Sequence, residues 1–415
     1  MVNRIPIPVI ALAVLLVSII HHGVAALGNL PPFRQELLST VGAHERFGSS
    51  VVITPDGRRL AIGAESSGRI YVYDRNSSGF WDQSANLSVP GLPLDSEFGK
   101  TIGISSDGNV IVVGAPYYAL PNTTYAGVVF IFRFNGSTWT SALMISEPSP
   151  ISGALLCYTT LAVSYDGSTI LCDRGGSLTS GFGVDVFFNN GATWSQQGPT
   201  ILVPPYGNST LGGAALSSNG SVLVFGAPYN NNSLGEVYVY ARNGSGIWRE
   251  SDLISAPPSS PTYFGFKVVI SADASVIAVE ANLATVFVLI LSGQGYTVLQ
   301  TINRPSGSTG GGFGQTAFVM SPSGNRIVIG DIYANYETSP VVIDKGGAFI
   351  FDRLLSLYNY TGQVYSNLIE PYSSSVGETG FGIALSLTEG NEILVGAPFT
   401  ANGDGKRFVI GMNCD

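Results

Sequence analysis

One stretch decides the fold: residues 98–116 read FGKTIGISSDGNVIVVGAP. It begins with Phe98-Gly99, passes through the turn pair Asp107-Gly108 and ends in Gly114-Ala115-Pro116. An Asp-Gly pair between two apolar runs is a strong signal for a β-hairpin. The run Val110–Val113 is apolar without alternation, which is typical of a strand that is buried on both faces. The stretch therefore predicts two paired strands inside a layered β structure.

The same pattern recurs along the chain. Phe-Gly pairs begin at five positions: Phe47, Phe98, Phe264, Phe313 and Phe381. Two degenerate copies, Cys157-Tyr158 and Thr210-Leu211, are located by the Asp-Gly or Asn-Gly turns that follow them. The units therefore start near residues 47, 98, 157, 210, 264, 313 and 381. A repeat of roughly 50 to 60 residues indicates an array of similar supersecondary units.

Each unit is expected to contain four strands. The third strand opens with Gly and is rich in Val and aromatic residues, as in Gly68–Tyr73. The fourth starts at a Trp, and all four tryptophans of the chain stand at this position: Trp81, Trp139, Trp194 and Trp248. Four-stranded units at this period are typical of a β-propeller. We therefore predict an all-β fold, a seven-bladed β-propeller of four-stranded antiparallel blades, that spans residues 27–415 as a single domain.

The two ends of the chain are expected to complete one blade together. The last unit runs out after its third strand, Arg407–Ile410, and Phe33–Val41 has the character of an unpaired fourth strand. We predict that this N-terminal strand closes the ring, which would leave no long open sheet edge. The alternative is a fraying N-terminus beside an incomplete last blade.

The repeat resembles the FG-GAP repeat in the N-terminal propeller of integrin α subunits. The resemblance rests on Phe-Gly, Asp-Gly, Gly-Ala-Pro and a Gly-x-Val-Tyr-Val-Tyr strand such as Gly235–Tyr240, and it extends from Phe33 to about Ile410. It implies adhesion or ligand recognition by loops on one face. Integrin blades also carry calcium loops with several carboxylates. Here Ser105-Ser106-Asp107-Gly108 offers one carboxylate, too few for the six or more oxygens that Ca²⁺ takes.

The composition limits the class of protein. Only 11% of the 415 residues are charged, 45% are hydrophobic, and the formal net charge is −9. The hydrophobic content argues against a disordered chain, and the excess of acids argues against nucleic-acid binding, which requires clustered Lys and Arg. Three cysteines are too few for a disulfide-stapled fold, so we expect a large apolar core.

Residues 1–25 have the layout of a secretory signal peptide. Arg4 precedes the apolar run Ile5–Ile20, and the small residues Gly23 and Ala25 suit cleavage after Ala25 or Ala26. We expect a secreted, extracellular protein without a membrane span in the mature chain. The alternative is an uncleaved N-terminal anchor that holds the protein at the cell surface.

Nine Asn-x-Ser/Thr sequons agree with export and predict a glycoprotein. They begin at Asn76, Asn86, Asn122, Asn135, Asn208, Asn219, Asn231, Asn243 and Asn359. The alternative is that they are polar turn residues whose spacing is accidental. Cys157 and Cys172 are candidates for a disulfide, although simple hairpin register places Cys157 nearer residue 176; otherwise both are buried thiols. Cys414 has no obvious partner.

Residues that commonly carry catalysis are sparse. His44 is the single histidine after the signal peptide, and we expect it in a solvated loop. Gly310–Gly314 lacks the lysine of a phosphate loop, so we expect an inter-blade turn. Acid pairs from distant blades remain an alternative, with candidates Glu97, Glu147, Glu280 and Glu370. We predict no catalytic site, no metal site and no cofactor.

We expect binding through the face that carries the loops between second and third strands and between blades. Tyrosines gather in these loops, and they offer apolar area and a hydroxyl with little entropy to lose. They are Tyr117, Tyr118, Tyr125, Tyr206, Tyr229, Tyr263, Tyr333 and Tyr336. The sequence thus predicts an adhesion-like module for an extracellular protein or glycan. The alternatives are a secreted propeller hydrolase or lyase, and a structural matrix component or truncated ectodomain.

Overall fold

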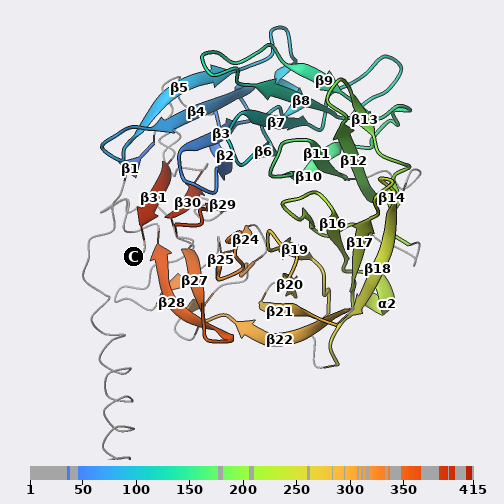
Figure 1. Ribbon diagram of the computed structural model, residues 1–415, viewed down its shortest axis with the longest axis vertical. Helices are drawn as coiled ribbons and strands as arrows, with labels where there is room; N and C mark the ends of the chain where they lie inside the picture. Colours follow the sequence, from blue (N-terminus) through green and yellow to red (C-terminus); the bar gives the residue numbers. More distant parts are fainter. Residues whose placement is uncertain are drawn as a thin grey trace, which may run out of the picture.

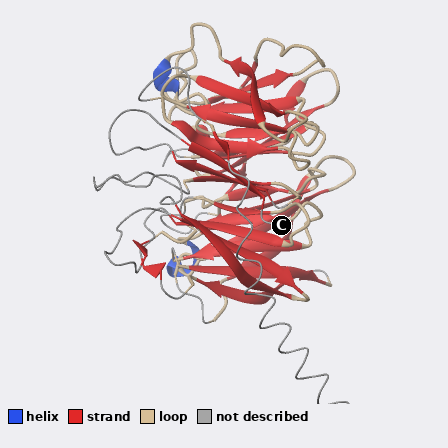
Figure 2. Ribbon diagram, turned by 90° about the vertical axis from the view of Figure 1, so that its left-hand side faces the viewer, coloured by secondary structure: helices blue, strands red, loops and turns tan. Residues whose placement is uncertain are grey.

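The computed structural model describes residues 35–37, 45–175, 181–204, 210–258, 262–282, 284–293, 295–305, 308–309, 312–314, 317–331, 335–336, 347–365, 383–390, 392–397 and 408–413. These residues form small antiparallel sheets arranged as blades around a central axis, so the fold is a β-propeller (Figure 1). Two short helices in this part of the chain, η2 (Leu94–Ser96) and α2 (Asn230–Ser233), lie in loops. Seen from the edge, the strands cross the ring and the loops gather on its two faces (Figure 2).

Six sheets within the described residues have four antiparallel strands, and we name each sheet by its first strand. The β2 sheet comprises β2 (Phe47–Ile53), β3 (Arg59–Ala64), β4 (Arg69–Arg75) and β5 (Trp81–Leu87). The β6 sheet comprises β6 (Ile102–Ile104), β7 (Val110–Ala115), β8 (Val128–Arg133) and β9 (Leu143–Ile145). The β15 sheet comprises β15 (Ala214–Leu216), β16 (Val222–Ala227), β17 (Glu236–Arg242) and β18 (Trp248–Ser255).

The remaining sheets follow in chain order. The β19 sheet comprises β19 (Lys267–Ile270), β20 (Val276–Ala281), β21 (Thr285–Ser292) and β22 (Gly295–Asn303). The β24 sheet comprises β24 (Phe318–Met320), β25 (Arg326–Asp331), β27 (Gly347–Leu354) and β28 (Leu357–Tyr365). The β29 sheet comprises β29 (Ala384–Leu387), β30 (Glu392–Ala397), β31 (Phe408–Asn413) and, outermost, β1 (Gln35–Glu36). A separate two-stranded sheet joins β23 (Ser308–Thr309) to β26 (Asn335–Tyr336).

The β10 sheet, between the β6 and β15 sheets, corrects the prediction of seven four-stranded blades. Six blades have four strands, whereas this sheet has five: β10 (Leu156–Val163), β11 (Thr169–Arg174), β12 (Gly183–Asn189), β13 (Trp194–Gln196) and β14 (Ile201–Leu202). Its outer edge is split because residues 197–200 stand opposite only two residues of β12, 185–186. Pro199 in this insertion has no N–H to give to the ladder. The outer strand therefore divides into two pieces, and both pair with β12.

The Phe-Gly and Gly-Ala-Pro motifs meet between neighbouring blades. Four phenylalanines of the Phe-Gly pairs are fully buried, and each stands edge-on to an aromatic ring of a third strand at 5.2 to 5.6 Å between ring centroids: Phe47–Tyr71, Phe98–Phe130, Phe264–Phe287 and Phe313–Phe349. The glycine of Gly-Ala-Pro lies against the backbone of the next Phe-Gly. A Cβ built on Gly226, for example, would overlap the carbonyl oxygen of Gly265. In the same way, a Cβ on Gly396 of the last sheet would overlap the carbonyl oxygen of Gly48 of the first.

The N-terminal strand β1 completes the last sheet. It pairs antiparallel with β31, in the position that the sequence predicts, so the last sheet lies beside the first (Figure 1). The Gln35 amide also accepts the N–H of Trp81 at 2.7 Å and donates to the Trp81 carbonyl at 2.9 Å, which clasps β1 to β5. Gln300 of β22 makes the same two bonds with Tyr358 of β28. β1 therefore takes the place of an ordinary outer strand.

A bulge in β10 brings two cysteines together. Residues 157–160 stand opposite a single residue of β11, Asp173, whose carboxylate accepts hydrogen bonds from the N–H groups of Thr159 and Thr160 at 2.9 to 3.1 Å. The bulge places the Cα atoms of Cys157 and Cys172 4.6 Å apart, and their sulfur atoms form a disulfide. Simple hairpin register, which does not include the bulge, would put Cys157 opposite a residue beyond Cys172.

Candidate functional site

Two pairs of the predicted tyrosines lie on one face of the ring. We call this the tyrosine face; it carries the connections between second and third strands and between sheets, and the opposite face, with the other turns, is the hairpin face. In the β7–β8 connection, the rings of Tyr117 and Tyr125 stand edge-on with centroids 5.4 Å apart. Tyr158 of β10 packs against Tyr117 at 5.9 Å. This aromatic cluster therefore spans the joint between the β6 and β10 sheets.

A lysine and a glutamate border the aromatic cluster. Lys100 Nζ lies 4.3 Å from the ring centroid of Tyr158, within the range of a cation–π contact, and 2.6 Å from Glu97 Oε2. A hydrogen bond with Tyr158 contributes most to raising the pKa of Tyr117 to about 12, followed by burial and the neighbouring negative charge. The Tyr117 side chain is therefore a neutral phenol at pH 7.

A cleft with a volume of 530 Å³ opens beside Tyr117 and Tyr125. The start of β2, the end of β3 and the β5–β6 connection supply its other walls: Arg46, Glu65, Ser66, Leu94, Asp95 and Glu97. Arg46 and Glu65 form an ion pair at 2.7 Å across the cleft wall. The cleft thus combines aromatic rings and an exposed leucine with three carboxylates, a mixture that can contact both the CH groups and the hydroxyls of a ligand.

Backbone hydrogen bonds fix the loops that carry the cleft. Tyr117 N–H donates to the Ser96 carbonyl at 3.2 Å, and Leu155 N–H donates to the Tyr125 carbonyl at 3.1 Å. Glu97 and Tyr125 have φ angles of 52° and 53°, a left-handed conformation that is costly for residues with a side chain. A cleft that is already held in one conformation loses little entropy when a ligand binds.

The second aromatic pair lies at another joint between blades. Tyr229 follows β16 and Tyr263 precedes β19, and their ring centroids are 5.3 Å apart. Both side chains are more than a third exposed, at 38% and 36%. Tyr263 N–H donates to the Ser233 carbonyl at 2.8 Å, which ties the pair to α2.

The other predicted tyrosines have different environments. Tyr118 is half-buried and packs against the ring of Phe130, with centroids 6.3 Å apart, so it anchors its loop to the core. Tyr336 lies in β26. Tyr206 and Tyr333 lie outside the described residues. The structure therefore brings together two pairs of the predicted set and assigns a packing role to Tyr118.

Sequence patterns alone do not point to Tyr158 or Lys100. In the structure Cys157 occupies the glycine position of its unit: its φ is 60°, in the left-handed region like that of Gly99 at 95°, and Gly114 lies against its backbone. Tyr158 therefore corresponds to Lys100, which follows directly after Phe98-Gly99. A cysteine where the Phe-Gly units carry glycine is the signal that marks this joint as unusual.

The predicted sequons lie in turns, connections and outer strands. Asn76, Asn135, Asn219 and Asn243 stand in turns of the hairpin face, Asn122 and Asn231 in connections of the tyrosine face, Asn86 in β5 and Asn359 in β28. All of these side chains are exposed except that of Asn76, which is half-buried. Asn208 lies outside the described residues. Eight of the nine predicted positions are therefore at least partly accessible for modification.

Of the acids considered for hydrolysis, the three that the structure describes do not offer a pair to a substrate. Glu280 is fully buried, and Glu147 is 5% exposed and forms a 2.5 Å ion pair with Arg174. Burial raises the pKa of Glu147 to about 7. Glu97 lines the tyrosine-face cleft, and Glu370 lies outside the described residues. Within the part of the chain that the structure describes, no group of three or more His, Cys, Asp or Glu side chains is placed to hold a metal ion.

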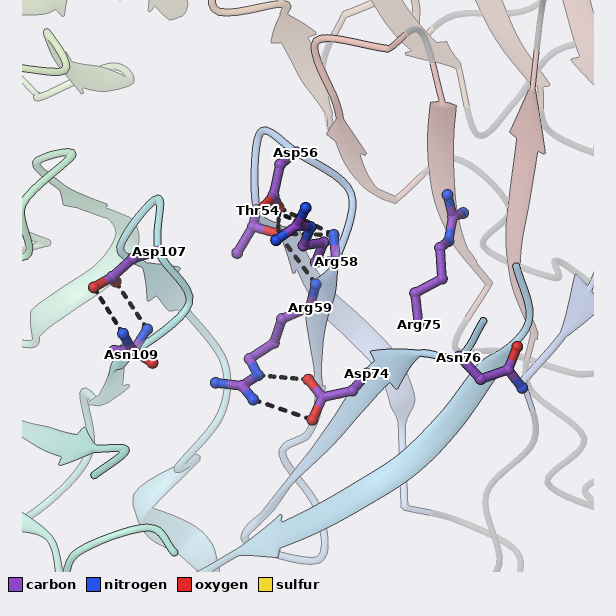
Figure 3. A pocket seen from close by; sticks show the side chains of 9 residues that line it. All are labelled: Thr54, Asp56, Arg58, Arg59, Asp74, Arg75, Asn76, Asp107 and Asn109. Carbon is purple, nitrogen blue, oxygen red and sulfur yellow. Dashed lines mark hydrogen bonds and ion pairs between the residues drawn. The ribbon is translucent and has the colours of Figure 1, made fainter. Parts of the chain in front are cut away.

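A second cleft, of 640 Å³, lies on the hairpin face where the β2 and β6 sheets meet, and its charged side chains pair with one another or with neighbours. Arg59 forms two hydrogen bonds with Asp74, at 2.6 and 3.1 Å (Figure 3). Its guanidinium also lies 4.4 Å from the ring centroid of Phe134 in the next sheet. Arg75 pairs with Glu392 of β30. These contacts join neighbouring blades, so we assign this cleft to blade packing.

The fold places the chain in the class of β-propellers, an architecture that commonly serves as a protein-binding module. Neither a scan against protein-family models nor a search of curated proteins finds a match to the chain. Among the described residues, no helix has the length and apolar character needed to cross a bilayer. The predicted signal peptide, residues 1–25, lies outside the described residues, as do His44 and Cys414.

Proposed function

We propose that this chain is a secreted or cell-surface glycoprotein whose propeller binds an extracellular protein or glycan through the tyrosine face. The observation that carries the proposal is the cleft beside Tyr117 and Tyr125, in which aromatic rings and carboxylates meet on rigidly held loops. Rigid scaffolds that present binding residues on loops are a general solution for recognition.

The sequence supports the cellular context of this proposal. The repeat resembles the FG-GAP repeat of integrin α propellers, which favours an adhesion-like role, and the signal-peptide layout and sequons favour export. We propose recognition without calcium, because the turns are satisfied internally. Asp107 Oδ1, for example, accepts from Ser105 Oγ at 2.6 Å and from the N–H of Asn109 at 2.9 Å.

The chemistry of the cleft sets the kind of partner. Tyr125 is 53% exposed and Leu94 is 62% exposed, so the cleft offers apolar contact area at its rim. The exposed Asp95 presents carboxylate oxygens that accept hydrogen bonds from hydroxyl or N–H donors, while Glu65 and Glu97 are held by Arg46 and Lys100. A sugar ring or a polar protein loop presents donors and apolar CH groups together. A hydrolase or lyase has less support, because the acids that it would use are buried or differently engaged.

A binding screen with matched tyrosine variants tests the proposal. Purified secreted protein is applied to arrays of glycans and of cell-surface ectodomains, and each binder is measured again with the double variant Tyr117→Ala/Tyr125→Ala. Because central aromatic residues carry much of the binding energy, we expect at least about a tenfold loss of affinity. Tyr165→Ala is the control, since Tyr165 is 61% exposed in a hairpin-face turn and should not affect binding. A binder that tolerates the double variant but not the control change would contradict the assignment of the face.

A further inference from the structure

The turn between β27 and β28 carries three exposed leucines. Leu354, at the end of β27, is 57% exposed, and Leu357, at the start of β28, is 47% exposed. Leu355 stands between them in the two-residue loop and is fully exposed. We call these three residues the leucine tip. It lies on the hairpin face, where the third strand of the β24 sheet turns into the fourth.

Backbone geometry and sequence both mark the leucine tip as unusual. The corresponding turns of the β2, β6 and β15 sheets open with the polar runs NSSG, NGST and NGSG, at residues 76–79, 135–138 and 243–246. Leu355 has a φ angle of 61°, in the left-handed region that tight turns normally give to glycine or asparagine. Local conformation therefore does not explain the leucines. An exposed apolar cluster that the turn does not require is typical of a surface that another group covers.

A predicted glycosylation site lies on the same side of the hairpin as the leucine tip. Side chains alternate along a strand, so Leu357 and Asn359 project from one face of β28, whereas Tyr358 between them is 2% exposed. Leu354 pairs with Leu357 and shares this face. The Asn359 side chain is exposed, and its Nδ2 donates to the Leu357 carbonyl at 3.1 Å. A sugar attached to this nitrogen would therefore begin beside Leu357.

We propose that an N-linked glycan on Asn359 covers the leucine tip and shields it from water and from other chains. The bond forms between Asn359 Nδ2 and the anomeric carbon of an oligosaccharide carried on a lipid pyrophosphate; the amide loses a proton and the pyrophosphate carrier leaves. The CH groups of the first sugar rings cover Leu354 and Leu357, and the sugar hydroxyls face water. The inference rests on the glycoprotein part of the function proposed above and not on the tyrosine face.

The position of the sequon favours a glycan over a second copy of the chain as the group that covers the tip. β28 is the outermost strand of the β24 sheet, so the leucines adjoin the edge of a strand. Apolar residues beside such an edge promote association between chains. A bulky, hydrophilic glycan on the same face blocks this approach. Association through the tip should therefore appear only when the glycan is missing.

Site-resolved mass spectrometry of the secreted protein provides the first test. We expect a glycan on Asn359. Other sequons that carry glycans while Asn359 is unmodified would overturn this inference and leave the proposed function unaffected. A secreted protein without any N-glycan would overturn the inference together with the glycoprotein part of the proposed function.

Asn359→Gln removes the glycan and should expose the leucine tip. We expect stronger fluorescence of the dye ANS, which binds exposed apolar surface, and a shift of the protein to larger species in size-exclusion chromatography. Asn86→Gln is the matched control. Asn86 also begins a sequon on an outer strand, β5, but the exposed residues next to it on that face are Ser84 and Ser88, so both signals should stay unchanged. Equal responses of the two variants would overturn the inference.

Serine substitutions distinguish a covered tip from a general effect of the glycan. Leu354→Ser/Leu357→Ser should reverse both signals when combined with Asn359→Gln, and should change neither signal while the glycan is present. A serine variant that lowers dye binding by the same amount with and without the glycan would overturn the inference. Where Asn359→Gln fails to fold, enzymatic removal of the glycans from the folded proteins gives the same comparison. Dye binding should then rise more in the parent protein than in the serine variant, and equal rises would overturn the inference.

Discussion

Deletion of Phe33–Val41 should produce a chain that aggregates and is not secreted in folded form. The deletion removes β1, so the backbone groups of β31 that face it lose their partners and form an open strand edge. Unpaired strand edges template association with other chains. The hydrogen bonds between Gln35 and Trp81 are lost as well, which weakens the joint between the last sheet and the first. Secretion yield and size-exclusion profiles of the truncated and full chains measure the effect.

A point variant distinguishes the effect of an unclosed ring from the effect of deleting a chain segment. Leu37 follows β1 and is 4% exposed in the apolar cluster that also contains Phe47 and Trp81. Leu37→Ala should lower the free energy of unfolding by about 2–5 kcal/mol, whereas Leu94→Ala, at a leucine that is 62% exposed, should change it by less than about 0.5 kcal/mol. Normal secretion of the truncated chain, together with equal stability of the two leucine variants, would refute closure by the N-terminal segment.

Gly226→Val should prevent stable folding or cost more than about 3 kcal/mol of unfolding free energy. A Cβ on Gly226 would overlap the carbonyl oxygen of Gly265 in the neighbouring blade, and both atoms belong to the backbone, so side-chain rotation cannot relieve the overlap. The two blades would have to separate, which would open the cluster around Phe264.

Gly244→Val is the matched control for this change. Gly244 lies in the β17–β18 turn, and a Cβ built there meets no atom within 4 Å. Its substitution should therefore alter the free energy of unfolding by less than about 0.5 kcal/mol. Chemical denaturation of the secreted proteins gives both values. A Gly226→Val protein as stable as the Gly244→Val protein would show that the Gly-Ala-Pro glycine is not a packing requirement.

Much of the fold is predictable because the same contacts recur from one repeat unit to the next. Each buried Phe-Gly phenylalanine meets an aromatic ring of a third strand, so a pattern of single residues predicts a whole blade. The five-stranded sheet is less accessible to such reasoning. Its split outer strand depends on how residues 197–200 pair with β12, where Gln196 Nε2 and Thr200 Oγ1 both donate to Asp185 Oδ1, at 2.7 and 2.6 Å. Periodicity along one chain segment does not contain this cross-strand contact.

The sequence predicts that these loops form a binding face, but it does not predict which residues meet there. Tyrosines in adjacent connections indicate a binding face, and the ring geometry then decides which of them meet. Tyr117 gains Tyr158 as a neighbour from the next sheet, whereas the adjacent Tyr118 turns to the core. Neighbouring residues of one loop thus have opposite roles, and only the packing of two blades distinguishes them.

Placing a glycan on each face in turn tests the proposed binding face most directly. Leu94→Asn creates a sequon with Ser96 at the rim of the tyrosine-face cleft, and Ala192→Thr creates one at Asn190 on the hairpin face. Binding of the two glycosylated variants is measured against a partner identified in the screen, after mass spectrometry has verified occupancy. We predict that the glycan at position 94 abolishes binding and that the glycan at Asn190 leaves it unchanged. Loss of binding with the glycan at Asn190 alone would contradict the account.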